Sequence, residues 1–272
     1  MDANCECLYH YTNVSSLALI LKNQNMKFNP LTVLDDSEEE KIQDTQKYGK
    51  YCYVSSWTED ENESIPMWNM YTNISEGVRI KLPKYPFQEY LLNTESFDKV
   101  NEKFDILGNG FNIIIPPKDY VYQNYFLSIP IQNKILKKVI YTNDTSLLYP
   151  RIKEISNGKT VISSNKLGIY KNDYWSFQKE WRYKLDFFPF GQMEMIKESN
   201  NGNKELLLKL ERAIDLPFNY YFLKLDREKF EHMEITLSPK INEGNRTIVK
   251  ILMDKYNPNA KIFESELTGK IR

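Results

Sequence analysis

The segment 174–188, YWSFQKEWRYKLDFF, predicts a long β-strand, because aromatic residues favour strands and polar residues recur at alternate positions. Gln178, Glu180 and Arg182 then share one face, while Trp181 and Tyr183 point to the other. On this pattern alone, the polar face is either the solvent side of an antiparallel strand or the wall of a site. A strand of this kind needs partner strands.

Other segments supply those partners. Short strands are expected at 8–12, 26–28, 51–58, 78–82, 111–115, 138–141, 220–225, 233–237 and 260–265. Helices are expected after the cap residue Asn13, within 36–49, around Met67, Trp68 and Tyr71, and over 245–256, with Trp68 buried against the sheet. We therefore predict one α+β domain over 1–272, with mixed or antiparallel central sheets, flanking helices and a weakly defined middle insertion at about 84–160.

Charge and hydrophobicity limit the functional class. Lys and Arg total 36 against 37 for Asp and Glu, which argues against a general polybasic nucleic-acid binder but leaves a local basic groove open. No apolar run approaches the roughly 20 residues that span a bilayer, and the N-terminus lacks the apolar core of a secretory signal. Three cysteines do not make a disulfide framework. We expect a cytoplasmic protein without a membrane partner.

Few residues can support metal or phosphate chemistry. Cys5, Cys7 and His10 are zinc-ligand types, but their spacing is not that of a standard finger, so we predict no metal. A strand histidine bonded to a backbone carbonyl is the simpler interpretation of His10. The chain lacks a glycine-rich phosphate loop, which argues against P-loop and Rossmann binding.

A nuclease is a further hypothesis. Glu39-Glu40-Lys41 supplies an E-x-K tripeptide that, with Asp35 and Asp36, would suit metal-dependent cleavage of nucleic acid. The tripeptide is common by chance in Lys/Glu-rich chains. A solvated helix face is the favoured interpretation of this segment.

Several blocks together resemble a bacterial family, the domain of unknown function 2971. They are, in order, Tyr9-His10-Tyr11-Thr12, Val54-Ser55-Ser56-Trp57-Thr58-Glu59, Met67-Trp68-Asn69-Met70-Tyr71 with Gly77, the run 175–182, and Leu237-Ser238-Pro239-Lys240. The resemblance covers almost the entire chain. This sequence has Asp35-Asp36-Ser37 where the family usually has Asn-Asp-Pro, and Gln178 where it usually has Glu.

The block order is in turn similar to that of ADP-ribosyltransferases. Those enzymes carry a His or Arg on the first strand, a Ser, Thr or Tyr on a middle strand, and a late Q-x-E or E-x-E. His10, Ser56 and Gln178-Lys179-Glu180 match that order. The resemblance implies an ADP-ribosyltransferase-like fold and an enzyme that uses NAD as substrate to modify a macromolecule, either nucleic acid or protein, as a toxin or phage-defence effector.

The resemblance also implies roles for individual residues. Glu180 would stabilise the positive charge that develops on the ribose, His10 would hold a ribose hydroxyl or a diphosphate oxygen, and Gln178 would contact the acceptor. The expected NAD-binding residues are Tyr11, Thr12, Ser56, Tyr71 and Arg182. We expect Glu180 in an exposed cleft, where Glu180→Gln would leave the fold intact.

An alternative from another class is a catalytically inactive nucleotide- or partner-binding module in a bacterial defence system. The departures from the family pattern motivate it. Geometry tests the enzyme hypothesis, because His10 and Glu180 are 170 positions apart and must face a common pocket beside the strand containing Ser55 to Thr58.

Overall fold

The computed structural model describes residues 6–44, 47–93, 96, 110–121, 123–128, 130–156, 159–199 and 204–271. Its strands are β1 (Cys7–Asn13), β2 (Asn25–Pro30), β3 (Cys52–Thr58), β4 (Gly77–Pro83), β5 (Tyr90–Leu92), β6 (Phe111–Ile113), β7 (Phe126–Ser128), β8 (Leu136–Lys138), β9 (Ile140–Tyr141), β10 (Lys153–Ser156), β11 (Lys159–Ile162), β12 (Tyr170–Lys171), β13 (Glu180–Phe188), β14 (Tyr221–Lys224), β15 (Glu234–Leu237) and β16 (Lys261–Phe263).

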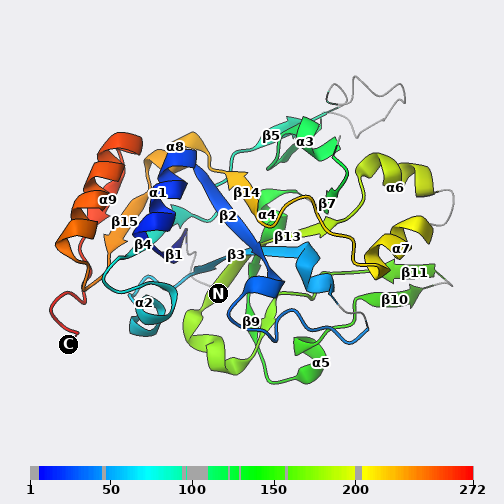
Figure 1. The fold of residues 1–272 in the computed structure, drawn as a ribbon, viewed down its shortest axis with the longest axis horizontal. Coiled ribbons are helices and arrows are strands. Elements are labelled where there is room, and N and C mark those ends of the chain that lie inside the picture. Colours follow the sequence, from blue (N-terminus) through cyan, green and yellow to red (C-terminus); the bar gives the residue numbers. More distant parts are fainter. Residues whose placement is uncertain are drawn as a thin grey trace.

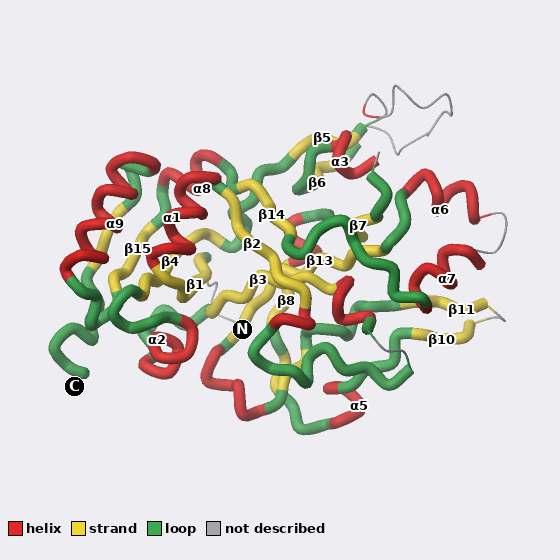
Figure 2. Tube along the Cα trace, in the orientation of Figure 1, coloured by secondary structure: helices red, strands yellow, loops and turns green. Residues whose placement is uncertain are grey.

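Helices flank these strands. They are α1 (Val14–Asn23), α2 (Ile65–Tyr71), α3 (Pro117–Val121), α4 (Gln132–Ile135), α5 (Thr145–Leu148), α6 (Gln192–Ser199), α7 (Lys204–Glu211), α8 (Arg227–Glu231) and α9 (Glu243–Tyr256), with 3₁₀ helices η1 (Leu31–Val33), η2 (Tyr48–Tyr51) and η4 (Asp173–Gln178). In Figure 1, α1, α8 and α9 lie at one end of the molecule and α6 and α7 at the other. Strands cross between them (Figure 2). The predicted α+β class is confirmed.

One large, mostly antiparallel sheet forms the centre of the molecule. Its main order is β14-β2-β3-β1-β4-β15-β16, and β13 pairs with β3, β7 and β8. Within this sheet, β15 and β16 run parallel. Along one edge, β3 pairs with β13 over its whole length, and along the other it meets first β2 and then, at Thr58, β1. The strands that begin near Tyr9 and Glu180 therefore flank the same end of β3.

Local sequence signals explain the ends of several helices. The Asn13 side chain accepts a hydrogen bond from the Ser16 amide and caps α1, as predicted. Asn242 caps α9 in the same way. Helix α1 buries one apolar face, which includes Leu17 and Leu21, and lies beside α9 (Figure 1).

Three sequence predictions about local structure were wrong or incomplete. The expected helix within 36–49 is replaced, over its described residues, by turns that lead into η2. The expected strand at 138–141 is divided between β8 and β9. The expected long strand from Tyr174 begins only at Glu180, because η4 occupies 173–178 and Lys179 adopts a left-handed conformation with φ 43°.

Helix α2 packs onto the sheet as the sequence predicted. Trp68 is completely buried, its ring meets Tyr11 edge to face at 4.8 Å, and its indole nitrogen donates to Glu63 at 2.9 Å. Glu63 also accepts hydrogen bonds from Ser265 and from the Glu266 amide, so this contact ties α2 to the C-terminal segment. Among the described residues, every helix is too short or too polar to span a lipid bilayer.

Candidate functional site

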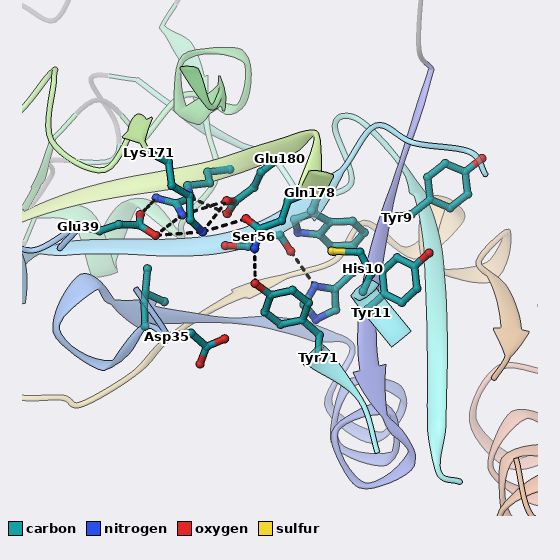
Figure 3. A pocket seen from close by; sticks show the side chains of 14 residues that line it. Tyr9, His10, Tyr11, Asp35, Glu39, Ser56, Tyr71, Lys171, Gln178 and Glu180 are labelled. Atoms are coloured by element: carbon teal, nitrogen blue, oxygen red, sulfur yellow. Dashed lines mark hydrogen bonds and ion pairs between the residues drawn. The ribbon is translucent and has the colours of Figure 1, made fainter. Parts of the chain in front are cut away.

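A pocket opens at the end of β3, between β1 and β13 (Figure 3). Its cavity volume is about 100 Å³. The lining side chains come from β1, β3, β12, β13, α2, η4 and the loop after η1: they are Tyr9, His10, Tyr11, Leu34, Asp35, Glu39, Ser56, Trp57, Met67, Tyr71, Lys171, Gln178, Glu180 and Arg182.

Strand register explains why residues so far apart in sequence meet here. Tyr9 and Glu180 both lie opposite Thr58, and Arg182 lies opposite Ser56. Since alternate residues of a strand share a face, Glu180 and Arg182 point to the same side of β13. The structure thus brings His10, Ser56 and Glu180 to one pocket, in the strand arrangement predicted from the sequence.

Four buried charged side chains form the inner wall of the pocket. The Arg182 guanidinium donates to Glu180 (Nε–Oε1 2.6 Å) and to Glu39 (Nη2–Oε1 2.9 Å). The Lys171 ammonium lies 3.1 Å from Glu39 and 3.3 Å from Glu180. Two carboxylates and two cations therefore compensate each other. Figure 3 shows three of the four, Glu39, Lys171 and Glu180, converging from the loop after η1, from β12 and from β13.

This network fixes the ionisation of its members. Burial alone raises the pKa of the Glu180 carboxyl, but the charges of Arg182 and Lys171 outweigh that effect and hold its pKa at about 2. For Arg182, burial alone lowers the pKa, but the neighbouring carboxylates Glu180 and Glu39 outweigh burial and raise the pKa above its usual value. Glu180 is consequently a carboxylate near neutral pH, and Arg182 remains a cation.

His10 has one ring nitrogen committed to the backbone. Its Nδ1 lies 2.8 Å from the carbonyl oxygen of Ser56, and its ring packs against Trp57 at 5.1 Å. Burial lowers the pKa of His10 below its usual 6.5. Because a carbonyl oxygen can only accept, Nδ1 of the neutral ring donates to Ser56, and Nε2 is left as an acceptor.

Gln178 reaches the pocket from η4 rather than from a strand. Its amide oxygen accepts a hydrogen bond from Lys171 at 2.9 Å, and its amide nitrogen donates to the hydroxyl of Tyr71. The Gln178 side chain is buried. The expectation that it shares a strand face with Glu180 was wrong, but both side chains still line the pocket.

Of the five predicted NAD-binding residues, four line the pocket and one does not. Tyr11, Ser56, Tyr71 and Arg182 line the pocket. The Tyr11 hydroxyl is already engaged, since it accepts from the Ser64 amide at 3.0 Å. Thr12 is buried in β1 but is not one of the lining residues.

Sequence reasoning missed the roles of Glu39 and Lys171. Glu39 was expected on a solvated helix face, yet only 5% of its surface is exposed. The turns that replace the expected helix direct this carboxylate inward, where it meets Arg182. No local pattern marks Lys171, because its two ion-pair partners lie in other parts of the sequence.

The metal hypotheses gain no support. No group of three or more His, Cys, Asp and Glu residues within the described part of the chain could hold a metal ion. Cys5 lies outside the described residues. Of the nuclease candidates, Asp35 and Glu39 line the pocket, whereas Lys41 forms an exposed ion pair with Glu38.

Comparison with known proteins gives one match, to a protein family. Curated proteins and solved structures show no significant match to the chain, so they provide no support for a resemblance to ADP-ribosyltransferases. A family match covers less than half of the chain, narrower than the almost complete resemblance expected from the sequence. It includes Lys171, Gln178, Glu180 and Arg182 but begins after His10 and Glu39. Residues 67–183 match the family described as "Protein of unknown function (DUF2971)".

Proposed function

We propose that the pocket binds the nicotinamide riboside end of NAD and cleaves its N-glycosidic bond, with transfer of ADP-ribose to a macromolecule. The observation that carries the proposal is that His10, Ser56 and Glu180, from three neighbouring strands, line one pocket. Its volume of about 100 Å³ is below the roughly 300–1,000 Å³ of sites that enclose a drug-sized ligand. Only one end of the dinucleotide would therefore enter.

The chemistry assigned to these residues is consistent with their ionisation. Breaking the bond between C1 of the ribose and the nicotinamide nitrogen sends the electron pair to nicotinamide and leaves positive charge on the ribose. The Glu180 carboxylate, ionised and held by Arg182 and Lys171, would stabilise that charge. C1 then bonds to a nucleophile of the acceptor, which loses a proton.

His10 and Tyr71 would orient the substrate. The free Nε2 of a neutral His10 can accept a hydrogen bond from a ribose hydroxyl. Tyr71 lines the same pocket and offers an aromatic face to the nicotinamide ring. Its hydroxyl is held by Gln178, which keeps the ring in place.

A second candidate is a binding module without turnover. The charge of Glu180 is already compensated by two cations, Arg182 and Lys171, and only 4% of the residue is exposed. Both facts favour binding without turnover, because they leave the carboxylate less available to a substrate. Two further cavities, one sharing Glu39 and Lys171 with the pocket and the other sharing Tyr9, present more carboxylates than cations, which favours a bound partner without phosphate groups.

Nicotinamide release distinguishes the two candidates. Purified protein is incubated with NAD, with and without cell extract as a source of acceptor, and free nicotinamide is quantified. The enzyme hypothesis expects release that Glu180→Gln abolishes. Binding of NAD by calorimetry without any release would instead favour the binding module, and neither binding nor release would reject both uses of NAD. Activity as a toxin or in phage defence stays a prediction.

A further inference from the structure

A second cavity, of about 270 Å³, adjoins the pocket and shares Glu39 and Lys171 with it. Four aromatic side chains line this cavity: Tyr149, Tyr170, Tyr174 and Trp175. They come from the end of α5, from β12 and from η4, three segments that the fold brings together. We call this the aromatic cavity.

Tyr174 is the most exposed of these rings, with 83% of its surface accessible. Tyr149 and Trp175 are half-buried. A large ring left this exposed at the mouth of a cavity gains contact area when a ligand covers it. The backbone holds Tyr174 in place, because its amide donates to the capping side chain of Asn172 at 3.1 Å.

Carboxylates supply the charge of the aromatic cavity. Asp36, Glu38 and Glu39 line it, against the single cation Lys171. The Lys171 ammonium is already occupied by Glu39, Glu180 and the Gln178 amide. Asp36 is buried, and Glu38 is paired with Lys41 at the surface. Arg182 and Lys171 together compensate Glu39 and Glu180, and Lys41 compensates Glu38, so the excess of negative charge beside the rings amounts to one carboxylate, that of Asp36.

The molecule already uses one of these rings to hold a cation. The Lys171 ammonium lies 4.6 Å from the centroid of the Trp175 ring, within the range of a cation–π interaction. A neutral nucleobase could also stack on such rings, but its phosphates would face the three carboxylates. A guanidinium stacks on aromatic rings and pairs with carboxylates at the same time.

We propose that the aromatic cavity binds a positively charged side chain, an arginine for preference, from a basic segment of a partner protein. The interaction stacks the guanidinium on Tyr174 and its neighbours and pairs it with Glu38 or Asp36. The proposal concerns binding alone and does not depend on cleavage of NAD.

The test uses the whole 272-residue chain and a fluorescently labelled peptide that contains three arginines separated by glycines. A matched peptide carries citrulline at the three positions, which keeps the shape and removes the charge. Anisotropy titrations without NAD compare the wild type with Tyr174→Ala and Glu38→Gln. Tyr220→Ala is the control, since Tyr220 is an exposed tyrosine next to β14, outside the lining of the cavity.

We expect the arginine peptide to bind, the citrulline peptide to bind at least about tenfold more weakly, and Tyr174→Ala to lose about fivefold in affinity. Glu38→Gln should weaken binding, and added salt should do the same in the wild type. Tyr220→Ala should bind as the wild type does. Equal binding of the two peptides, or full affinity in Tyr174→Ala, would overturn the proposal. So would tighter binding of a single-stranded oligonucleotide.

Discussion

Glu39 accepts hydrogen bonds from the guanidinium of Arg182, although 143 positions separate the two residues in the sequence. Both side chains are buried. The contact joins the loop after η1 to β13, and it leaves Arg182 shared between Glu39 and Glu180. Glu39 is therefore a positioning residue in the candidate site, because it acts on Glu180 through Arg182 and Lys171.

Glu39→Gln should destabilise the protein by about 3 kcal/mol or more, because it leaves two buried cations with one carboxylate. Chemical denaturation at pH 7 measures this change. Glu40→Gln, a change of the neighbouring glutamate, which does not line the pocket, should alter stability by less than about 0.5 kcal/mol. Equal stability of the two variants would show that the Glu39 ion pairs are not important for the fold.

Trp68→Ala should cost about 3–5 kcal/mol of unfolding free energy, because the ring is completely buried and its removal leaves a cavity. Trp68→Phe retains most of the apolar contact but loses the hydrogen bond to Glu63. We expect a smaller loss for this variant, because the Glu63 carboxylate keeps Ser265 and the Glu266 amide as donors. Denaturant titrations of both variants check the ranking. A loss below about 1 kcal/mol for Trp68→Ala would contradict the packing of α2 on the core.

Strands and caps could be predicted from sequence where a local pattern decides them. Asn13 caps α1 through an amide only three residues away, and β3 includes Tyr53, Val54, Trp57 and Thr58, which favour strands. The start of β13 could not be predicted, because the aromatic residues of 174–177 also fit a 3₁₀ helix that the turn at Lys179 ends.

Some residues of the candidate site could be predicted from the sequence and others could not. His10 and Glu180 could be named from the order of the blocks, and the register of β3 brings them together. Glu39 could not be found, because an acidic run in a Lys/Glu-rich chain is typical of a solvated surface. Glu39 is buried because it pairs with Arg182, which lies far along the chain. No local pattern in residues 35–40 reveals that contact.

His10 should make the protein lose stability as the pH falls below 6.5. Burial lowers its pKa in the folded state, so below pH 6.5 the unfolded chain binds a proton that the folded protein does not. This contribution is fully present above pH 6.5. The loss from pH 7.5 to 5.5 can reach at most about 1.4 kcal/mol for one group.

His10→Asn should remove this pH dependence, whatever it does to stability at pH 7.5. The readout is the difference between the unfolding free energies at pH 7.5 and pH 5.5, measured for wild type and variant in the same buffer series. Glu180 contributes little to this difference, because its pKa of about 2 lies far below the range from pH 5.5 to 7.5. An identical pH dependence in both proteins would argue against a buried neutral His10.

Glu180→Gln tests the proposed chemistry, and the structure corrects the expectation that Glu180 lies in an exposed cleft. With 4% exposure, Glu180 is not an exposed cleft residue, and among the described residues the change leaves Glu39 as the only carboxylate partner of Lys171 and Arg182. We expect nicotinamide release from NAD to fall by about 100-fold or more, together with a measurable loss of unfolding free energy at pH 7.

The pH dependence of that stability loss identifies its cause. The folded-state pKa of about 2 lies below the ordinary 4.5, so the ionised carboxylate stabilises the fold fully above pH 4.5 and loses this effect as the pH falls toward 2. The stability gap between wild type and Glu180→Gln should thus be constant from pH 5 to 7 and shrink from pH 4.5 downward. Glu231→Gln, at the end of α8 with an exposed Arg227 partner, should show neither effect. If folded Glu180→Gln protein releases nicotinamide at the wild-type rate, Glu180 is not the catalytic carboxylate.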